Sequence, residues 1–454
     1  MAYVTTNPAT GQVDATFDFH TPSEVDERLE LAHRAASLWR TTPIERRARH
    51  MSTAAELLEG EVPVIAEMLT REMGKTFAAA KGEVSKCAQA MRYYAEHGAA
   101  FLDDELIASS GSSSGIRYDP LGAILAVMPW NFPLWQVIRF AAPNLMAGNV
   151  GVLKHASNVP QAARFLEGLF LRAGFPLGCF VNLLIPSSRV DEVIRDERIA
   201  AVTLTGSEAA GKAVASTAGD VLKKCVLELG GSDAFVVAGS ADLDRCVPKA
   251  VTARVQNNGQ SCIASKRFIV VASRAEEFLD RFSTSMAELV VGDPLDPGTD
   301  VGPLVSASQR EEVAGQVDDA LAKGAVALTG GSLLGGDGFF YQPTVLTGVT
   351  TAMRAGAEEI FGPVAVVHAV PDLDAAIELA NATPWGLGAS IWAQDDAEQR
   401  QGIEQLDAGM VFVNAMVAST PELPFGGIKR SGYGRELAAI GMREFTNAKT
   451  FYVA

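Results

Sequence analysis

The sequence predicts an α/β fold of two domains, because short apolar segments alternate with helical stretches in two successive series. The first series has strand candidates at 123–128, 151–153, 180–184 and 201–204. The second series has strand candidates at 234–237, 267–271, 364–368, 389–392 and 410–413. Strands that alternate with helices favour a parallel sheet with both faces covered. A chain of 454 residues is long enough for two or three domains, and Gly230-Gly231 separates the two series.

The first hundred residues are predicted to be mainly helical. Apolar residues between Val25 and Trp39 recur at offsets of three and four, behind a helix-start signal at Thr21. Further amphipathic helices are expected at about 45–74 and 77–99.

Composition and charge exclude several classes of protein. The chain carries 38 Lys and Arg against 54 Asp and Glu, and this net charge of −16 argues against binding to nucleic acid or an anionic membrane. Its five cysteines are widely separated, so we expect neither a disulfide framework nor a metal site. The sequence has no leader pattern and no apolar run of membrane-spanning length, so a cytoplasmic protein is the expectation.

Some sequence patterns indicate other chemistries only superficially. Residues 111–115 satisfy the Gly-x-Ser-x-Gly pattern of hydrolases, but no apolar strand precedes this Ser- and Gly-rich stretch, and we expect a loop or exposed hairpin. Residues 206–213 resemble a P-loop, but Ala213 replaces the Ser or Thr that would hold Mg²⁺. The Gly-x-Gly-x-x-Gly fingerprint of Rossmann proteins is absent, so a dinucleotide would need another mode of recognition.

One cysteine, Cys262, has the surroundings of a nucleophile. It lies in the run Gln-Asn-Asn-Gly-Gln-Ser-Cys-Ile at 256–263, where small polar residues and glycine let a thiol meet a ligand and be ionised. The alternative interpretation of Cys262 is a small buried hydrophobe. None of the six histidines has the sequence context of a papain-like partner, so another base is needed.

Glu228, Asn131 and the segment Thr205-Gly206-Ser207 supply the other groups that such chemistry requires. Glu228 ends an apolar run, where desolvation would raise its pKa toward the range of a general base, although a strand-end salt bridge is the alternative. Asn131 lies between two prolines and two aromatic residues, where its amide can donate to an oxyanion or form an Asx turn. The segment at 205–207 follows a strand and opens a helix, whose N-terminus can bind phosphate.

An ordered set of motifs resembles the aldehyde dehydrogenase superfamily. The motifs are PWNFP, LKHAS, TGSEAAG, LELGG, GQSC, EEIFGP and PFGGIKRSGYGRE, in that order. The resemblance extends from Asn7 to the end of the chain. It implies a Rossmann-like cofactor domain and an α/β catalytic domain with a small β oligomerisation extension.

The resemblance also implies a covalent mechanism that needs no metal. Cys262 corresponds to the nucleophile that attacks the aldehyde carbon, and Asn131 with the Cys262 backbone N–H would hold the thiohemiacetal oxyanion. Hydride transfer to a nicotinamide would leave a thioester, and Glu228 would activate the water that hydrolyses it. A non-catalytic ligand-binding or structural member of the same fold is the alternative from another class.

The cofactor that the resemblance implies is NADP. The family's cofactor contacts carry over to Trp130, Lys154, Ser157, Gly206, Ser207, Leu229, Glu359 and Phe361. By similarity, Lys154 would contact the adenosine ribose, Ser207 the pyrophosphate and Glu359 the nicotinamide ribose. NAD-preferring relatives often carry Glu where this chain has Ser157, which does not repel a 2′-phosphate. We therefore expect NADP to be preferred, with weaker use of NAD.

The substrate is expected to be an aldehyde that carries a carboxylate. The run PWNFPLWQVIR is similar to succinate-semialdehyde dehydrogenases, in which the residues matching Arg139 and Ser419 bind the substrate carboxylate. Trp135 and Phe425 are predicted pocket walls. Some of these relatives have a second Arg where this chain has Gln256, so glutarate semialdehyde or a broader set of aldehydes is the alternative.

The same similarity implies a division of the chain into domains. Residues 1–101 and 121–229 would form the cofactor-binding domain, and 230–438 the catalytic domain. Residues 102–120 and 439–454 would be the oligomerisation segments. A homodimer or a homotetramer is expected, since closed symmetric assembly is the usual form of such interfaces.

Overall fold

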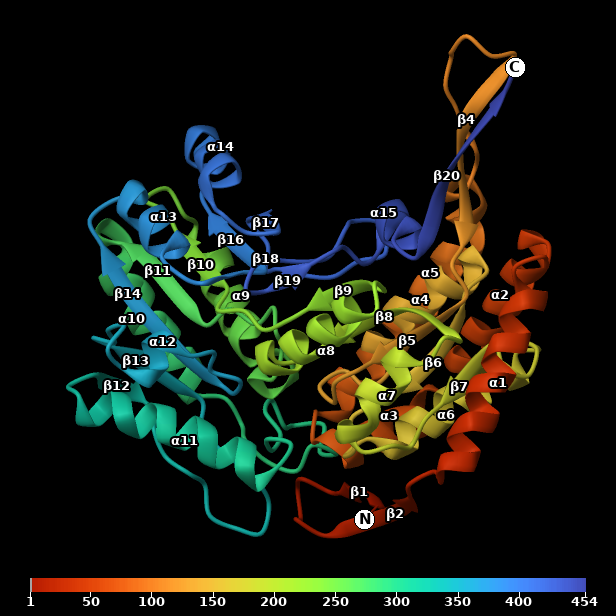
Figure 1. Cartoon of the computed structure of the whole chain (residues 1–454). Helices are drawn as coiled ribbons and strands as arrows, with labels where there is room; N and C mark the ends of the chain where they lie inside the picture. The colour runs from red at the N-terminus through yellow and green to blue at the C-terminus, as the bar shows by residue number, and fades with distance from the viewer. Residues whose placement is uncertain (1) are drawn as a thin grey trace.

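Two large, mainly parallel sheets organise the chain, and helices pack against both (Figure 1). The structure is a computed structural model that describes residues 2–454. The strand candidates of both series lie in strands of these sheets, with helices between them. The predicted α/β fold is therefore confirmed.

The first sheet has the strand order β19-β9-β8-β5-β6-β7. Its strands are β5 (Ala123–Val127), β6 (Val150–Lys154), β7 (Phe180–Asn182), β8 (Ile199–Thr205), β9 (Lys224–Glu228) and β19 (Gly432–Tyr433). Its helices are α1 (Pro22–Trp39), α5 (Trp135–Ala147), α6 (Pro160–Arg172), α7 (Val190–Arg195) and α8 (Glu208–Asp220). All its strands except β19 run parallel, so the carboxyl ends of β5, β8 and β9 meet at one edge. Ligand sites of α/β proteins lie beyond such an edge.

The N-terminal region forms a separate two-stranded hairpin and a group of helices, several of which pack against α5 and α6. These elements are β1 (Ala2–Thr6), β2 (Val13–Asp18), α2 (Ile44–Gly60), α3 (Val62–Met73) and α4 (Phe77–Phe101). The Thr21 hydroxyl accepts the N–H of Glu24 at 3.3 Å, and the Glu24 carboxylate accepts the N–H of Thr21 at 2.7 Å. This reciprocal capping accounts for the predicted start of α1. The expected helical stretch at 45–74 is divided in two because Pro63 begins a new helix.

The second sheet has the strand order β12-β13-β14-β11-β10-β16-β17. Its strands are β10 (Ala234–Val237), β11 (Arg267–Val271), β12 (Val326–Thr329), β13 (Thr344–Thr347), β14 (Val364–Val370), β16 (Gly388–Trp392) and β17 (Met410–Val413). Its helices are α9 (Leu243–Val255), α10 (Ala272–Ala287), α11 (Ala307–Ala322), α12 (Arg354–Ala357), α13 (Leu373–Asn381) and α14 (Asp396–Gln405). A short pair, β15 (Trp385–Gly386) with β18 (Ile428–Lys429), lies beside it.

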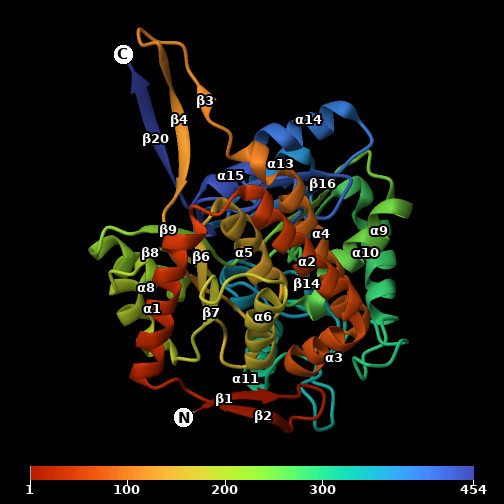
Figure 2. The same cartoon turned by 90° about the vertical axis from the view of Figure 1, so that its right-hand side faces the viewer.

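A third, three-stranded sheet extends away from both large sheets (Figure 2). Its strands are β3 (Glu105–Leu106), β4 (Ser113–Pro120) and β20 (Thr446–Val453), and α15 (Ala438–Arg443) precedes β20. β20 runs antiparallel to β4 along its whole length. The Ser- and Gly-rich stretch at 108–115 spans the connection from β3 to β4 and confirms the predicted exposed hairpin.

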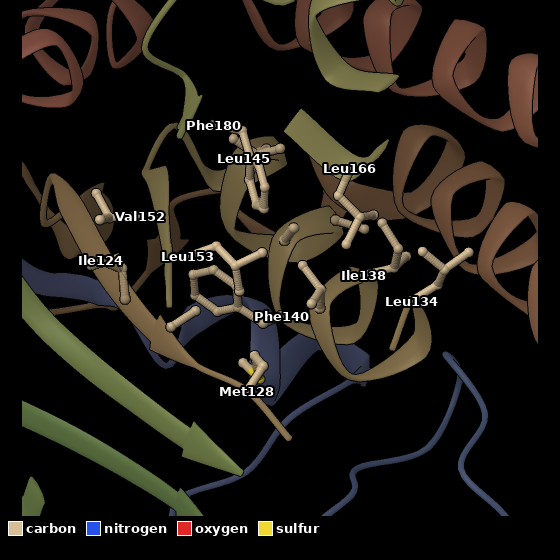
Figure 3. Packing of buried hydrophobic residues seen from close by; sticks show 14 of the residues in the cluster. Ile124, Met128, Leu134, Ile138, Phe140, Leu145, Val152, Leu153, Leu166 and Phe180 are labelled. Carbon is tan, nitrogen blue, oxygen red and sulfur yellow. The ribbon is translucent and has the colours of Figure 1, made fainter. Parts of the chain in front are cut away.

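The core of the first sheet holds α5 in place behind the carboxyl edge. Leu134, Ile138 and Phe140 pack into one cluster with Ile124 and Leu153 of the sheet (Figure 3). All five side chains are at most 2% exposed. Burial of such a side chain contributes about 1.5–3 kcal/mol relative to leaving it exposed. This packing fixes the loop between β5 and α5, which carries Asn131.

One strand lies across the predicted boundary between the domains. Residues 230–438 contain the whole second sheet, but β19 lies on the first sheet, where Gly432 pairs with Glu228. The chain therefore returns to the first sheet before it reaches the third. The division remains a prediction in its other respects.

Two kinds of feature are not found within residues 2–454. No helix there is long and apolar enough to cross a membrane. Nor do three or more His, Cys, Asp or Glu side chains in that range gather as a metal site would require.

Candidate active site

A cavity lies at the carboxyl edge of the first sheet and opens to solvent. Its walls come from the loop after β5, the ends of β8 and β9, the loop before β11 and the segment before β14. It contains about 730 Å³ of empty space. The predicted site residues that line it are Trp130, Asn131, Gly206, Ser207, Glu228, Leu229, Cys262, Glu359 and Phe361.

The loop that carries Cys262 is held by its own asparagines. Asn257 and Asn258 have φ values of 55° and 58°, a left-handed region that Asn adopts more readily than most residues. The Asn257 amide donates to the carbonyls of Asn131 at 2.8 Å and Gln260 at 3.0 Å. Asn258 donates to two further backbone carbonyls, at 2.8 Å and 3.0 Å. The Asn257 bond to Asn131 joins the cysteine loop to the loop of Asn131, and the Asn258 bonds join it to Gly74 and Pro303.

The Asn131 amide faces the cysteine loop. Asn131 is buried, and its Nδ2 donates to the carbonyl of Gln260 at 3.2 Å. An amide nitrogen carries two donors, and this bond uses one of them. The other N–H is available to a ligand oxygen at the cavity wall that Asn131 shares with Cys262. This geometry suits the predicted oxyanion contact.

Glu228 is a buried carboxyl group at the end of β9. It is 2% exposed, and within the described part of the chain neither of its carboxylate oxygens has a hydrogen-bond partner. Burial and the nearby Glu436 raise the pKa of Glu228 well above its usual value, against the opposing charges of Arg139 and Arg435. The carboxylate of a group with a raised pKa is a stronger base than an exposed carboxylate, and one with no protein partner can accept a proton from water or a thiol.

The Cys262 thiol is a free and largely desolvated group. Burial raises its pKa to about 11, while the positive charges of Arg139 and Lys266 act in the opposite direction. Cys262 is therefore protonated at neutral pH in this structure. It needs a base during the reaction, and Glu228 lines the same cavity.

The opposite side of the cavity combines a helix N-terminus with two aromatic rings. Ser207 is the N-cap of α8, and its hydroxyl accepts the N–H of Ala210 at 3.3 Å. The free N–H groups of such a helix end attract an anion. The rings of Trp130 and Phe361 meet edge to face with their centroids 5.6 Å apart.

Glu359 is fixed by a lysine that sequence reasoning missed. Its carboxylate forms an ion pair with Lys266 at 3.1 Å. Lys266 also donates to the carbonyls of Ser261 at 3.0 Å and Cys262 at 2.6 Å. A side chain on Gly230 would lie 2.1 Å from the Glu359 carboxylate, so only glycine leaves room for it. One buried cation thus holds both the cysteine loop and Glu359.

Lys154 and Ser157 lie beyond the main cavity. Lys154 ends β6, is buried, and donates to the Ser187 hydroxyl at 3.2 Å. Its pKa is lowered by burial. Ser157 lines an adjoining pocket that shares Trp130 with the main cavity. The donor set along both pockets fits an elongated anionic ligand such as a phosphorylated dinucleotide.

The surroundings of Arg139 differ from those expected of a residue that binds a substrate carboxylate. It is 1% exposed, forms an ion pair with Glu436 and donates to the Thr205 hydroxyl at 3.3 Å. Its guanidinium carbon lies 4.3 Å from the centroid of the Phe425 ring, and neither residue lines the cavity. The sequence could not show that Glu436 would neutralise this charge. The prediction that Arg139 binds a substrate carboxylate is untested, and this pairing argues against it.

Two further predicted substrate residues, Ser419 and Trp135, lie beside Lys86, which the sequence did not single out. The Ser419 hydroxyl accepts the indole N–H of Trp135 at 3.0 Å and a hydrogen bond from Lys86 of α4 at 2.7 Å. Ser419 and Trp135 are buried. The sequence did not point to Lys86, because the pattern of residues around it indicates only an amphipathic helix.

Comparisons with known proteins agree with the motifs. The sequence model of the aldehyde dehydrogenase family matches residues 2–451. The chain is 56% identical to "Succinate-semialdehyde dehydrogenase [NADP(+)] 1" of Mycobacterium tuberculosis, covering 100% of both chains. It is 55% identical to "Succinate-semialdehyde dehydrogenase [NADP(+)]" of Mycobacterium avium, covering 100% of this chain and 97% of the other. A succinic semialdehyde dehydrogenase from Streptococcus pyogenes, solved with NADP+, is similar in structure, with a TM-score of 0.97, 39% identity and 100% of both chains covered.

Proposed function

The chain belongs to the aldehyde dehydrogenase family, and on that premise we propose that it oxidises succinate semialdehyde to succinate with NADP. The observation that carries the reaction class is the meeting of Asn131, Glu228 and Cys262 at one cavity. The substrate and cofactor are supported by full-length relatives named for both.

The first step is the addition of the Cys262 sulfur to the aldehyde carbon. The thiol proton leaves to a base, for which Glu228 is placed on the same cavity wall. The carbonyl π electrons move to the oxygen, and the free N–H of Asn131 with the backbone N–H of Cys262 stabilises the resulting oxyanion. Donors that are already oriented towards developing charge lower the barrier without reorganisation.

The cofactor contributes one piece of chemistry, since a bound oxidised nicotinamide accepts the hydride from the substrate carbon. The residues of the chain bind and orient the cofactor. Ser207 and the start of α8 would hold the pyrophosphate, and Glu359 would hold the nicotinamide ribose. Lys154 and Ser157 would hold the adenosine ribose, where the neutral Ser157 would leave room for a 2′-phosphate.

The last step is hydrolysis of the thioester on Cys262. The proton that Glu228 took from the thiol first leaves to solvent. Glu228 then removes a proton from water, the water oxygen bonds to the acyl carbon, the carbon–sulfur bond breaks, and the departing sulfur takes the proton from Glu228. The products are the carboxylic acid and the Cys262 thiol. The raised pKa of Glu228 suits this role because its carboxylate is then a stronger base than an exposed one.

The test is an assay of purified protein with succinate semialdehyde and NADP, followed by the absorbance of reduced nicotinamide. We expect reduction that depends on both reactants, one equivalent of succinate per NADPH, and slower reduction of NAD. Heat-treated protein is the control. Reduction of NADP with other aldehydes but not with succinate semialdehyde would overturn the substrate, and reduction with no aldehyde would overturn the function.

The third sheet is the segment that we assign to self-association. The exposed fractions of Leu106, Tyr452 and Val453 on this sheet are 76%, 55% and 52%. Exposed apolar side chains and open strand edges favour pairing with another chain. We therefore expect a homodimer or a homotetramer. A monomer in a sedimentation-velocity experiment would contradict this expectation.

A further inference from the structure

The first turn of α5 receives its cap from a different helix. The N-cap residue of α5 is Leu134, and an apolar side chain cannot accept the free N–H groups at a helix start. Instead, Oε1 of Glu83 on α4 accepts the backbone N–H of Leu134 at 2.8 Å and that of Trp135 at 2.9 Å. Glu83 is 4% exposed, so these bonds are shielded from solvent. A carboxylate from a distant part of the chain therefore fixes the start of α5.

The second oxygen of Glu83 is paired with a buried lysine. Oε2 accepts from Nζ of Lys75, and both side chains of this ion pair are almost fully buried. The Lys75 ammonium also lies 4.2 Å from the centroid of the ring of Phe132, which directly follows Asn131 in the chain. A buried carboxylate is tolerated when a cation and hydrogen bonds satisfy it. Glu83 can thus cap α5 without being left as an unpaired charge.

The capped turn contacts the amide of Asn131 directly. Gln136, in the first turn of α5, donates from its Nε2 to Oδ1 of Asn131 at 3.5 Å. The other end of that amide, Nδ2, donates to the carbonyl of Gln260 at 3.2 Å. Both ends of the Asn131 amide are therefore held, one by α5 and the other by the cysteine loop. A shift of this turn would move the amide relative to Cys262, with which it shares the cavity.

The segment that leads into α4 is also joined to the cysteine loop. The Asn258 amide donates to the carbonyl of Gly74 at 2.8 Å, and Gly74 directly precedes Lys75. The pair of Lys75 and Glu83 is therefore connected on one side to the cysteine loop and on the other to the start of α5. It ties together the two loops whose relative position the reaction depends on.

We propose that Glu83 is a positioning residue, which caps α5 from α4 and thereby holds Asn131 where its amide stabilises the oxyanion. Glu83 is not one of the residues that line the cavity, so it acts through Asn131 and not on the substrate. This inference rests on the proposed function, because it needs Asn131 as the oxyanion donor. Misplacement of such a group by about 1 Å can cost about 10²-fold in rate, so loss of the cap should lower kcat.

Glu72 on α3 offers a matched control, because it caps α6 in the same way. Its carboxylate accepts the backbone N–H groups of Gln161 at 2.8 Å and Ala162 at 3.0 Å, and it is 1% exposed. The helix α6 follows β6, and so it does not begin at the loop of Asn131. Removal of either cap should lower the Tm, whereas only removal of Glu83 should lower kcat.

The experiment measures kcat at saturating NADP with succinate semialdehyde, together with the KM for NADP. In Glu83→Ala we expect kcat to fall by about 10- to 100-fold and the KM for NADP to change by less than about twofold. Glu83→Gln keeps an oxygen that can accept both N–H groups, so it should restore most of kcat although it loses the ion pair with Lys75. Glu72→Ala should keep a kcat close to that of the wild type.

A double-mutant cycle with Asn131→Ala gives a readout that a merely structural role would not move. Once the amide is absent, the cap has no oxyanion donor left to position. The double variant Glu83→Ala/Asn131→Ala should therefore have nearly the kcat of Asn131→Ala, whereas independent effects would multiply. If Glu83→Ala does not fold, Glu83→Asp replaces it in the cycle. Its carboxylate keeps the charge but is one methylene shorter, and we expect the same non-additivity.

The outcomes separate this inference from the proposed function. A wild-type kcat in Glu83→Ala, or losses that multiply in the double variant, would overturn the inference alone. An equal loss of kcat in Glu83→Ala and Glu72→Ala would also overturn it, because both caps would then act only through stability. A normal kcat in Asn131→Ala would overturn the proposed role of Asn131, and this inference with it.

Discussion

The catalytic part of the site and its cofactor-binding part, which extends beyond the cavity, differ in how their polar groups are satisfied. At the catalytic end, Glu228 is buried without a hydrogen-bond partner in the described chain, and the Cys262 thiol is desolvated. At the cofactor end, Glu359 is paired with Lys266, and Lys154 donates to Ser187. Unsatisfied buried groups cost stability and persist where chemistry needs them. For these two carboxyl groups, the comparison indicates that Glu228 is kept free of charged partners, while Glu359 is held beforehand by an ion pair.

The largest effect is expected from Cys262→Ala, which removes the nucleophile. Turnover of succinate semialdehyde should fall to background, because no covalent intermediate can form. The affinity for NADP should be nearly unchanged, since Cys262 is at the catalytic end. Tryptophan fluorescence titration with NADP checks the binding and the reduced-nicotinamide assay checks the turnover. Substantial residual turnover would contradict the assignment.

Glu228→Gln should have the next largest effect. Loss of a general base lowers kcat by about 10²- to 10⁴-fold, and the KM for NADP should change little. Glu359→Gln is the matched control, because the same change at the cofactor end should raise the KM for NADP and lower kcat less. If the two variants behaved alike, the contrast between free and paired carboxylates would fail.

Asn131→Ala should lower kcat by about 10²- to 10³-fold through loss of an oxyanion donor. Because this contact strengthens as charge develops, the KM for the aldehyde should change much less than kcat. Circular dichroism would verify that the loop change leaves the fold intact. A variant with normal kcat and a raised KM would show that Asn131 binds the ground state instead.

The smallest of these effects is expected at the cofactor end. Ser157→Glu should shift the ratio of kcat/KM for NADP over NAD toward NAD by at least about tenfold, since its charge repels a 2′-phosphate. Ser157→Ala separates this repulsion from simple loss of the hydroxyl. Unchanged selectivity in Ser157→Glu would show that the phosphate lies elsewhere.

Sequence patterns were sufficient to predict which residues that end strands or open helices lie at the site. Glu228 ends β9 and Ser207 caps α8, so parallel pairing alone brings them to one edge. The fold class followed from the same alternation of strands and helices. Cys262 was recognisable because a polar, glycine-containing run is unusual around a thiol.

Pairings between distant segments could not be predicted in this way. Arg139 seemed free because its partner, Glu436, belongs to the chain that returns along β19. Lys86 is 333 residues from Ser419, and only the folded chain joins them. Lys266 was missed for the same reason, since its contact with Glu359 crosses between separate segments. Charge balance at a site is thus a property of tertiary structure.

The most direct test of the account is a pre-steady-state experiment on Glu228→Gln with excess NADP and succinate semialdehyde. The account predicts that NADPH formation slows, because the thiol loses its base, and still reaches about one equivalent per active site before a slower steady turnover, as thioester hydrolysis becomes limiting. Intact-protein mass spectrometry should then find a succinyl group on Cys262. Absence of both this first equivalent and the adduct, with steady turnover at the wild-type rate, would contradict the assignment of Glu228 and Cys262.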